Sequence, residues 1–343
     1  MKHGLLMSEN VEARNGIIVV KEAKDKVWQA LPERPLVSII VPSYNQGAFI
    51  RQTIDSCLEQ DYRPIEIIVM DGASTDETVE VLKSYGEIPE LKWVSEPDEG
   101  VQDAVNKGVA KAEGILCGIQ SSDDAYMPQA VSAAVAHFQR QPEMALIYGD
   151  AVKIDEQGEE ISRWRTGSFS ITNFLSKKTH VQQSAAFFRR DAFLQIGGWS
   201  SDYFIADTEC WLRMILEYPA LKVDEWWGRQ RRHEAQRDHQ SMKINDSFVQ
   251  MLQQNTMIQE GSWRWRRAAR CGMIRHRLRY GETPSSEDIR KAYWLAIRAW
   301  PPVVMDREVL STICPIYLGV ERRWRQLKQG KGGASGTTEG AGL

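Results

Sequence analysis

Two adjacent carboxylates, Asp123 and Asp124, follow an apolar run that ends at Ile119. Carboxylate oxygens just past a buried strand can bind a hard cation such as Mg²⁺ or Mn²⁺, which takes one or two protein carboxylates together with substrate phosphates. The same pair also suits the start of a helix expected over Met127–Phe138, where acidic side chains interact favourably with the helix dipole. The pair therefore predicts either a metal site or a helix cap.

Three more carboxylates stand where an expected strand ends or an expected helix begins. Asp71 follows the apolar run Ile65–Met70, and Asp207 and Glu209 open a helix expected over Asp207–Tyr218. At a strand end, Asp71 can accept hydrogen bonds from a ribose or a base, or it can close a turn of the chain. Asp207 and Glu209 can act as a general base, although the helix dipole alone also explains acidic residues there.

A basic segment, Arg229–Glu234, contains Arg231, Arg232 and His233. Clustered guanidinium groups beside an imidazole suit a phosphate-rich ligand, and a solvated basic loop is the simpler alternative. The sequence contains neither a G-x-G-x-x-G loop after an expected strand nor a G-x-x-x-x-G-K-[ST] loop. This argues against a dinucleotide-binding Rossmann site and against a P-loop.

Short apolar strands alternate with amphipathic helices in the first part of the chain. In chain order we expect strand 37–41, helix 49–60, strand 65–70, helix 77–85, strand 91–95, helix 101–112 and strand 114–119. This alternation predicts an α/β fold in which helices cover both faces of a sheet and ligands bind outside the carboxyl ends of its strands. Further strands are expected to end at Asp150 and to run over 151–155 and 181–189, and further helices to run over 190–196 and 207–218.

The length of 343 residues predicts about two domains, or one large domain with an appendage. We expect an N-terminal extension over 1–35 with a strand at Gly16–Val20, a main domain over 36–245, a basic helical region over 246–329 and a disordered tail over 330–343. No apolar run reaches the ~18 residues of a membrane span, and no secretory signal is visible. Five cysteines without a C-x-x-C pair are expected to be buried, reduced thiols, as in a cytoplasmic protein.

Charge is distributed unevenly along the chain. The net charge is −3, yet residues 229–331 hold 17 arginines and 4 lysines against 10 acidic residues. Aromatic and basic side chains are mixed there, as in Trp263–Arg267 and Glu321–Arg325. Such helices can pack on the main domain with solvated arginine faces, or they can bind an anionic membrane surface. Nucleic acid is the least favoured partner.

In combination, these motifs resemble the family 2 glycosyltransferases, whose GT-A fold is a Rossmann-like mixed sheet flanked by helices. The resemblance covers roughly residues 35–245 and is carried by Val37–Asn45, Met70–Asp76, Glu96–Gly100, Asp103–Gly108, Ser121–Asp124, Gln182–Arg190, Gly197–Trp199 and Ala206–Glu209. Two positions depart from the family pattern. Ser121 stands where the family's D-x-D metal motif begins, and the family's Glu-Asp segment reads Ala206-Asp207.

The resemblance implies a role for each matching position. Contacts to the nucleotide are expected from Pro42, Ser43, Tyr44, Asn45, Asp71, Asp98 and Asp103. A divalent cation, Mg²⁺ or Mn²⁺, is expected at Asp123 and Asp124, and positive charge at the diphosphate from Arg231, Arg232 or His233. Asp207 is the expected base, with Glu209 as second choice, and Gln182, Gln183 and Glu209 are expected on the acceptor side.

The resulting prediction is a non-processive glycosyltransferase of polysaccharide biosynthesis, because the Q-x-x-R-W motif of processive synthases is absent. It would move a hexosyl group from a nucleotide-diphosphate sugar to a hydroxyl of a glycan or lipid-linked saccharide, with inversion at the anomeric carbon. The alternative is a binding or scaffold protein with a degenerate site, as Ser121 suggests. We expect a cytoplasmic location, with the basic C-terminal region as the part that would bind the inner face of the plasma membrane.

Overall fold

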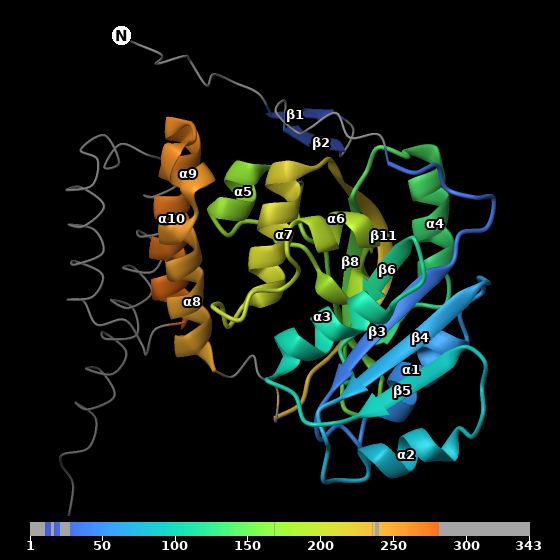
Figure 1. Cartoon of the computed structure of the whole chain (residues 1–343). Helices are drawn as coiled ribbons and strands as arrows, with labels where there is room; N and C mark the ends of the chain where they lie inside the picture. The colour runs from blue at the N-terminus through green and yellow to red at the C-terminus, as the bar shows by residue number, and fades with distance from the viewer. Residues whose placement is uncertain are drawn as a thin grey trace, which may run out of the picture.

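The structure is a computed structural model that describes residues 11–14, 17–20, 28–167, 169–234, 236 and 240–280. Its centre is one sheet with helices on both sides (Figure 1). The described residues contribute eleven strands to this sheet, namely β1 (Val11–Arg14), β2 (Ile17–Val20), β3 (Val37–Ser43), β4 (Ile65–Asp71), β5 (Leu91–Ser95), β6 (Leu116–Ile119), β7 (Ala125–Tyr126), β8 (Leu146–Ile154), β9 (Glu160–Trp164), β10 (Ala186–Arg189) and β11 (Ala220–Arg231).

The sheet is mixed, as predicted. Its strand order is β1-β2-β11-β8-β10-β6-β3-β4-β5, with β7 paired to β11 and β9 paired to β8. Strands β6, β3, β4 and β5 run parallel to one another, while β10 runs antiparallel to both β6 and β8. In this register Ser43 pairs with Asp71, and Asp71 pairs with Ser95, so three strand ends lie side by side. Ligands of such sheets bind beyond this edge.

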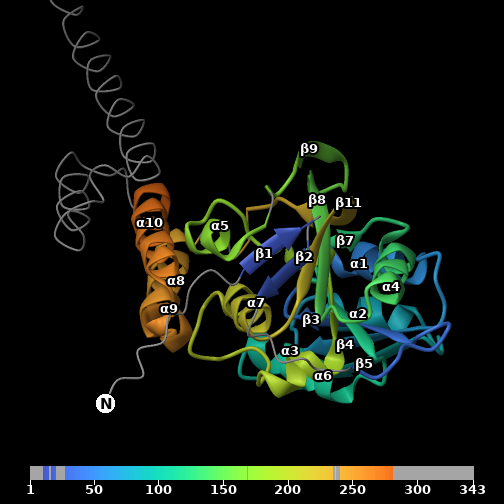
Figure 2. The ribbon, with the colours of Figure 1, turned by 90° about the horizontal axis from the view of Figure 1, so that it is seen from above.

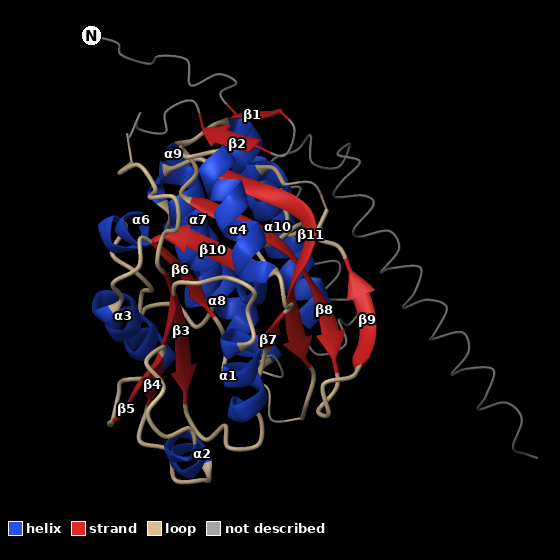
Figure 3. Cartoon of the chain, turned by 90° about the vertical axis from the view of Figure 1, so that its right-hand side faces the viewer, coloured by secondary structure: helices blue, strands red, loops and turns tan. Residues whose placement is uncertain are grey.

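Helices cover both faces of the sheet, as the predicted α/β class requires (Figure 3). They are α1 (Ile50–Leu58), α2 (Thr78–Ser84), α3 (Val101–Lys111), α4 (Ala130–Arg140), α5 (Ile171–Leu175), α6 (Arg190–Gln195), α7 (Ala206–Glu217), α8 (Ser241–Gln254), α9 (Thr256–Glu260) and α10 (Trp263–Tyr280). Because side chains alternate along a strand, Ile39 and Val41 of β3 join the core formed with α1 and α4, while Ile40 joins the core formed with α3 and α7.

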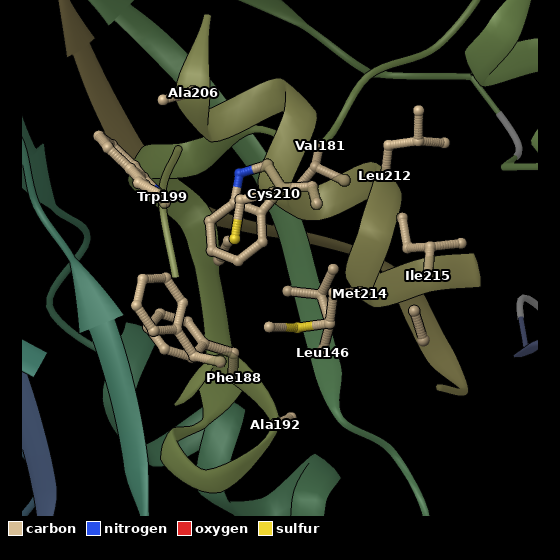
Figure 4. Close-up of a cluster of buried hydrophobic side chains, with 14 of the residues drawn as sticks. Leu146, Val181, Phe188, Ala192, Trp199, Ala206, Cys210, Leu212, Met214 and Ile215 are labelled. Atoms are coloured by element: carbon tan, nitrogen blue, oxygen red, sulfur yellow. The ribbon is translucent and has the colours of Figure 1, made fainter. Parts of the chain in front are cut away.

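The second core lies between the sheet and α7. Figure 4 shows Cys210 and Met214 of α7 beside Phe188 of β10, with Trp199 above Phe188. Burial raises the pKa of the Cys210 thiol well above its usual value, although Arg213 lowers it slightly. Among the described residues Cys57, Cys117, Cys210 and Cys271 are buried and free, as predicted, and Cys314 lies outside the described residues.

The C-terminal helices α8, α9 and α10 share a hydrophobic core with the helices that cover the sheet. Figure 2 shows α8, α9 and α10 beside α5 and α7, and Phe248, Leu252, Ala268 and Ala269 are buried in the core that α7 also lines. The domain boundary expected at residue 245 falls inside α8. In the described part of the chain no helix is both long enough and apolar enough to cross a bilayer. The rest of the basic region and the tail lie outside the described residues.

Three local predictions differ from the structure. The expected break at Asp150 is absent, because β8 continues through it to Ile154, where the hairpin turn begins. The strand expected over 181–189 is shorter, since a turn of 3₁₀ helix over 183–185 precedes β10. Strand β11 was not predicted, because charged residues interrupt its apolar pattern. The strand expected at Gly16–Val20 is present as β2.

Candidate active site

The loops that follow β3 and β4 are bound to each other. The Asn45 backbone N–H donates to Ser74 Oγ at 2.8 Å, and the Thr75 backbone N–H donates to Asn45 Oδ1 at 2.9 Å. Asn45 has a φ of 52°, a left-handed conformation that asparagine tolerates better than most residues. These bonds hold the loop that follows buried Pro42 and Ser43, and Tyr44 in this loop is 60% exposed at the strand ends.

Asp71 is buried and fully engaged with the protein. Its carboxylate accepts hydrogen bonds from the Ser74 N–H at 3.0 Å, from Ser74 Oγ at 2.5 Å and from Ser95 Oγ at 2.6 Å. It thus joins the ends of β4 and β5 and closes the turn after β4. The structure shows Asp71 closing this turn, and its contact to a nucleotide stays a prediction.

Asp98 and Asp103 flank the start of α3. Asp98 Oδ1 accepts from the Gly100 N–H at 2.9 Å, and a Cβ on Gly72 would lie only 2.8 Å from Asp98 Oδ2. Asp98 therefore lies against the loop after β4, next to the expected nucleotide contacts. Asp103 instead pairs with Lys107 at 2.7 Å along the helix, and this hydrogen bond lowers the pKa of the Asp103 carboxyl.

The Asp123–Asp124 turn meets the end of β11. Asp124 is buried, and its Oδ1 accepts the Arg231 backbone N–H at 2.9 Å. Asp123 Oδ2 lies 3.0 Å from His233 Nε2, across 110 residues of sequence. Helix α4 begins only at Ala130, after Gln129 as its N-cap, so the alternative that these carboxylates cap that helix is wrong.

Arg231 is buried among backbone carbonyls. Burial lowers the pKa of its guanidinium, while Asp124 and Asp123 oppose that effect. The expectation that Arg231 faces the diphosphate loses its support, because the side chain is completely covered. Half-buried Arg232 donates to Gln230 Oε1 at 2.9 Å, and His233 lies against the Phe49 ring with centroids 4.6 Å apart.

The expected acceptor side connects with the same turn. Gln183 Nε2 lies 3.4 Å from Ser121 Oγ, the position where the family pattern has its first carboxylate. Gln182 is buried and bonds Ser184 Oγ at 3.2 Å, while its Oε1 lies 3.0 Å from His180 Nε2. Gln183 thus contacts the turn that carries Asp123, and Gln182 bonds within its own segment.

The two acidic residues of α7 differ in their surroundings. Glu209 is buried and forms a two-fold hydrogen bond with Arg213, at 2.6 and 2.7 Å. Asp207 is half-buried in the first turn of α7. Within the described chain no hydrogen bond or ion pair holds its carboxylate. Of the two carboxylates, only that of Glu209 is held by a hydrogen-bonded partner in the described structure.

Several residues of this site were missed from sequence. Phe49 and Gln52, at the start of α1, contact His233 and Arg231, but an aromatic residue and an amide near a helix start carry no chemical signal of their own. Gln120, directly after β6, is fully buried. In the described structure neither its amide nor the buried Ser43 Oγ has a hydrogen-bond partner. A glutamine ending an apolar strand was the available signal.

The ligand set suits a divalent cation bound together with phosphate. Across the described residues no three His, Cys, Asp or Glu side chains form a metal-binding group. Asp123 Oδ2 and His233 Nε2 offer two ligands at 3.0 Å from each other. Mg²⁺ or Mn²⁺ at a nucleotide site needs only one or two protein ligands, because substrate phosphates and water complete the coordination. The residues present therefore fit such an ion.

Comparisons with known proteins identify the family of the chain. The model of the glycosyl transferase family 2 matches residues 38–197. The chain is 31% identical over 191 residues to a PGL/p-HBAD biosynthesis glycosyltransferase of Mycobacterium bovis, covering 54% of this chain and 72% of that relative. It is 33% identical over 141 residues to the chondroitin synthase of Escherichia coli, covering 40% of this chain but only 21% of that protein. The chain therefore belongs to glycosyl transferase family 2.

Solved structures show the same fold. The S. aureus TarS 1-349 structure in complex with UDP-GlcNAc superposes with a TM-score of 0.59 at 15% identity, covering 84% of this chain and 91% of that one. The mannosyltransferase PcManGT of Pyrobaculum calidifontis, in complex with GDP-Man and Mn²⁺, superposes with a TM-score of 0.52 at 19% identity, covering 86% and 90%. The predicted GT-A fold is confirmed.

Proposed function

We propose that this chain is an inverting glycosyltransferase that moves a sugar from a nucleotide-diphosphate donor to a hydroxyl acceptor with the help of a divalent cation. Its membership of family 2 supports the reaction class. The observation that carries the proposal is the pairing of Asp123 with His233 at 3.0 Å, at the edge where β3, β4, β5 and β6 end. Two remote segments thus place one carboxylate and one imidazole where a donor diphosphate would bind in such a sheet.

The cation site in this proposal consists of Asp123 and His233. A bound Mg²⁺ or Mn²⁺ would neutralise charge on the diphosphate as it leaves. Asp124 fixes the turn through the Arg231 N–H and through its own carbonyl, which accepts from Thr53 Oγ1 at 2.7 Å. Half-buried Arg232 is the guanidinium of this segment that we expect to approach the diphosphate, since Arg231 is covered.

We assign nucleotide recognition to the bound pair of loops after β3 and β4. The exposed Tyr44 ring offers a flat face for a base. Asn45 and Asp71 hold the loops in place, and Ser43 and Asp98 supply oxygens at the same edge. Structures of two GT-A neighbours contain UDP-GlcNAc and GDP-Man, which supports a nucleotide sugar as the donor class.

Asp207 is the base in this proposal. Its carboxylate would accept the proton of the acceptor hydroxyl as that oxygen attacks the anomeric carbon from the face opposite the diphosphate. A single displacement of this kind inverts the configuration. The acceptor would be a glycan or a lipid-linked saccharide near Gln183, because Gln183 contacts the turn that carries Asp123.

A membrane surface is part of the proposed setting. Trp263, at the start of α10, is 52% exposed, and the guanidinium groups of Arg264 and Arg267 lie 5.7 and 6.0 Å from its ring centroid. An indole with adjacent cations suits the interface of an anionic membrane. We therefore propose peripheral binding to the cytoplasmic face, where a lipid-linked acceptor would be found.

One observation favours a second candidate, a nucleotide-binding protein without transferase activity. Ser121 replaces a carboxylate, and its hydroxyl is within hydrogen-bond distance of Gln183. A calorimetric titration with UDP, GDP and dTDP, each with and without Mn²⁺, tests the donor and cation site, and release of nucleoside diphosphate from a donor sugar in the presence of Mn²⁺ separates the two candidates. Binding of one nucleotide that strengthens with Mn²⁺ and is lost in Asp123→Ala supports the proposal. Asp61→Ala, at the opposite end of β4, is the matched control. Equal binding by the wild type with and without Mn²⁺ would contradict the cation site.

A further inference from the structure

The Arg231 side chain connects three other segments of the chain at the candidate active site. It is fully buried, with 0% of its surface exposed. Its Nε donates to the Asp123 carbonyl at 2.7 Å, and Nη1 donates to the carbonyls of Asp155 and Glu156 at 2.7 and 2.8 Å. Its Nη2 donates to Gln52 Oε1 at 2.6 Å. The guanidinium thus binds the turn after β6, the hairpin between β8 and β9, and α1.

The backbone of the same residue binds the metal turn a second time. The Arg231 N–H donates to Asp124 Oδ1 at 2.9 Å, just beyond the point where β7 and β11 pair through Ala125 and Arg229. Arg231 therefore holds the turn at two points: its side chain binds the Asp123 carbonyl, and its backbone N–H binds the Asp124 carboxylate. The guanidinium carbon also lies 5.0 Å from the Phe49 ring centroid, and Phe49 contacts His233.

We propose that Arg231 is a positioning residue for the divalent cation rather than a contact to the donor diphosphate. By fixing the Asp123 carbonyl and the Phe49 side chain, it keeps Asp123 Oδ2 and His233 Nε2 next to each other, so that one ion that replaces the contact between them could bind both. The inference rests on the proposed cation site, but it does not require that the enzyme transfer sugar. Removal of a group that orients metal ligands typically weakens metal binding by roughly 10–100-fold.

Lysine cannot replace this arginine in the same role. A guanidinium presents five N–H groups in a rigid plane, and Arg231 directs them to acceptors in three different segments. The lysine ammonium keeps the positive charge but concentrates its donors at one point. Arg231→Lys therefore separates geometry from charge. If charge near the diphosphate were the role of this residue, lysine would largely preserve function.

The chain offers a matched control in Arg189, which is 2% exposed. Arg189 donates to the carbonyls of Met144, Gln29 and Pro142, at 3.0, 3.2 and 2.6 Å. It pairs with Leu116 at the beginning of β6, so it lies at the edge of the sheet opposite the turn that follows Ile119. Arg189→Lys should therefore weaken the fold to a similar degree without moving the cation ligands.

The test measures Mn²⁺ binding to the full-length protein by the electron paramagnetic resonance signal of free Mn²⁺, with circular dichroism to check folding. We expect Arg231→Lys to raise the Kd for Mn²⁺ at least about tenfold, and Arg189→Lys to change it less than about twofold. In the double variant, Arg231→Lys should add little to the loss of Mn²⁺ affinity caused by Asp123→Ala, because both substitutions act on the same metal ligand. Wild-type affinity in folded Arg231→Lys, or an equal loss in Arg189→Lys, would overturn the inference.

A second variant keeps the test decisive if Arg231→Lys does not fold. Gln52→Met removes one acceptor of the guanidinium and leaves the turn after β6 untouched. We expect a smaller rise in the Kd for Mn²⁺, about two- to fivefold; an unchanged Kd would contradict the inference. A wild-type protein that binds Mn²⁺ but turns over no nucleotide sugar would refute the proposed function alone. A wild type that binds no Mn²⁺, with or without nucleotide, would refute both.

Discussion

Asn106 of α3 connects the donor side of the site to the helix that carries Asp207. Its Nδ2 donates to the Trp199 carbonyl at 2.8 Å, and its Oδ1 accepts the Trp199 N–H at 2.9 Å. A Cβ on Gly198, which has a φ of 68°, would overlap the Asn106 amide, so the loop and the side chain fit each other closely. This loop leads into α7, which carries Asp207 in its first turn.

Replacing Asn106 with alanine removes both hydrogen bonds and leaves two backbone groups of Trp199 unpaired. At about 0.5–1.5 kcal/mol for each bond, the free energy of unfolding should fall by about 1–3 kcal/mol. A shift of the loop of about 1 Å would also lower kcat by up to roughly 100-fold, because the base would be misplaced. The nucleotide affinity should change much less, since the loops after β3 and β4 are untouched.

Urea unfolding and steady-state kinetics of Asn106→Ala test this reasoning. The matched control is Gln139→Ala, which removes an exposed amide that donates to the Glu33 carbonyl at 2.7 Å, far from the strand ends. We expect the control to keep its kcat. An unfolding free energy of Asn106→Ala within about 0.5 kcal/mol of the wild type would refute the assigned role of the two hydrogen bonds in stability. An unchanged kcat in a destabilised Asn106→Ala would refute the idea that contacts of α3 position Asp207 of α7.

Three further predictions follow from other contacts. Asp207→Asn should retain nucleotide binding and lose most transfer, and near-full activity would exclude Asp207 as the base. Glu66 is buried, and hydrogen bonds from Ser38, Lys92 and the Glu113 N–H outweigh that burial and lower its pKa. Glu66→Gln should lower the unfolding free energy by about 1–3 kcal/mol at pH 7. Because the folded protein stabilises the charged form of Glu66, the difference between wild type and variant should shrink as the pH falls below about 4. A difference in urea midpoints that stays constant across this pH range would contradict the prediction. Gly118→Ala would overlap the buried Tyr126 hydroxyl and should lower the unfolding free energy by about 1–3 kcal/mol, which thermal melting can check.

The fold of the first half of the chain could be predicted from sequence because local patterns determine it. Continuous apolar runs such as Ile65–Met70 are buried strands, and the turn residues after them lie at one edge of the sheet. Strand β11 could not be predicted in the same way. Charged residues interrupt it, and Lys222 is buried because its ammonium pairs with Asp150 at 3.0 Å, a contact that only the folded sheet creates.

The candidate site was predicted as a set of residues but not as a set of contacts. Asp123 and His233 could each be named from sequence, yet their 3.0 Å approach depends on how β7 and β11 pair. Arg231 and Arg232 look alike in the sequence, but Arg231 is the last residue of β11 and is covered, whereas Arg232 follows the strand and is half-buried. Burial of an arginine depends on tertiary partners such as Gln52, which no local pattern reveals.

The most direct test of the central claim is the release of nucleoside diphosphate from UDP- and GDP-sugars by the full-length protein, measured with Mn²⁺ and with a chelator. We predict that one donor is turned over only with the metal, and that both Asp123→Ala and His233→Ala lose this activity while remaining folded. Equal turnover with the chelator, or full activity of His233→Ala, would contradict the assignment of these two residues to the cation.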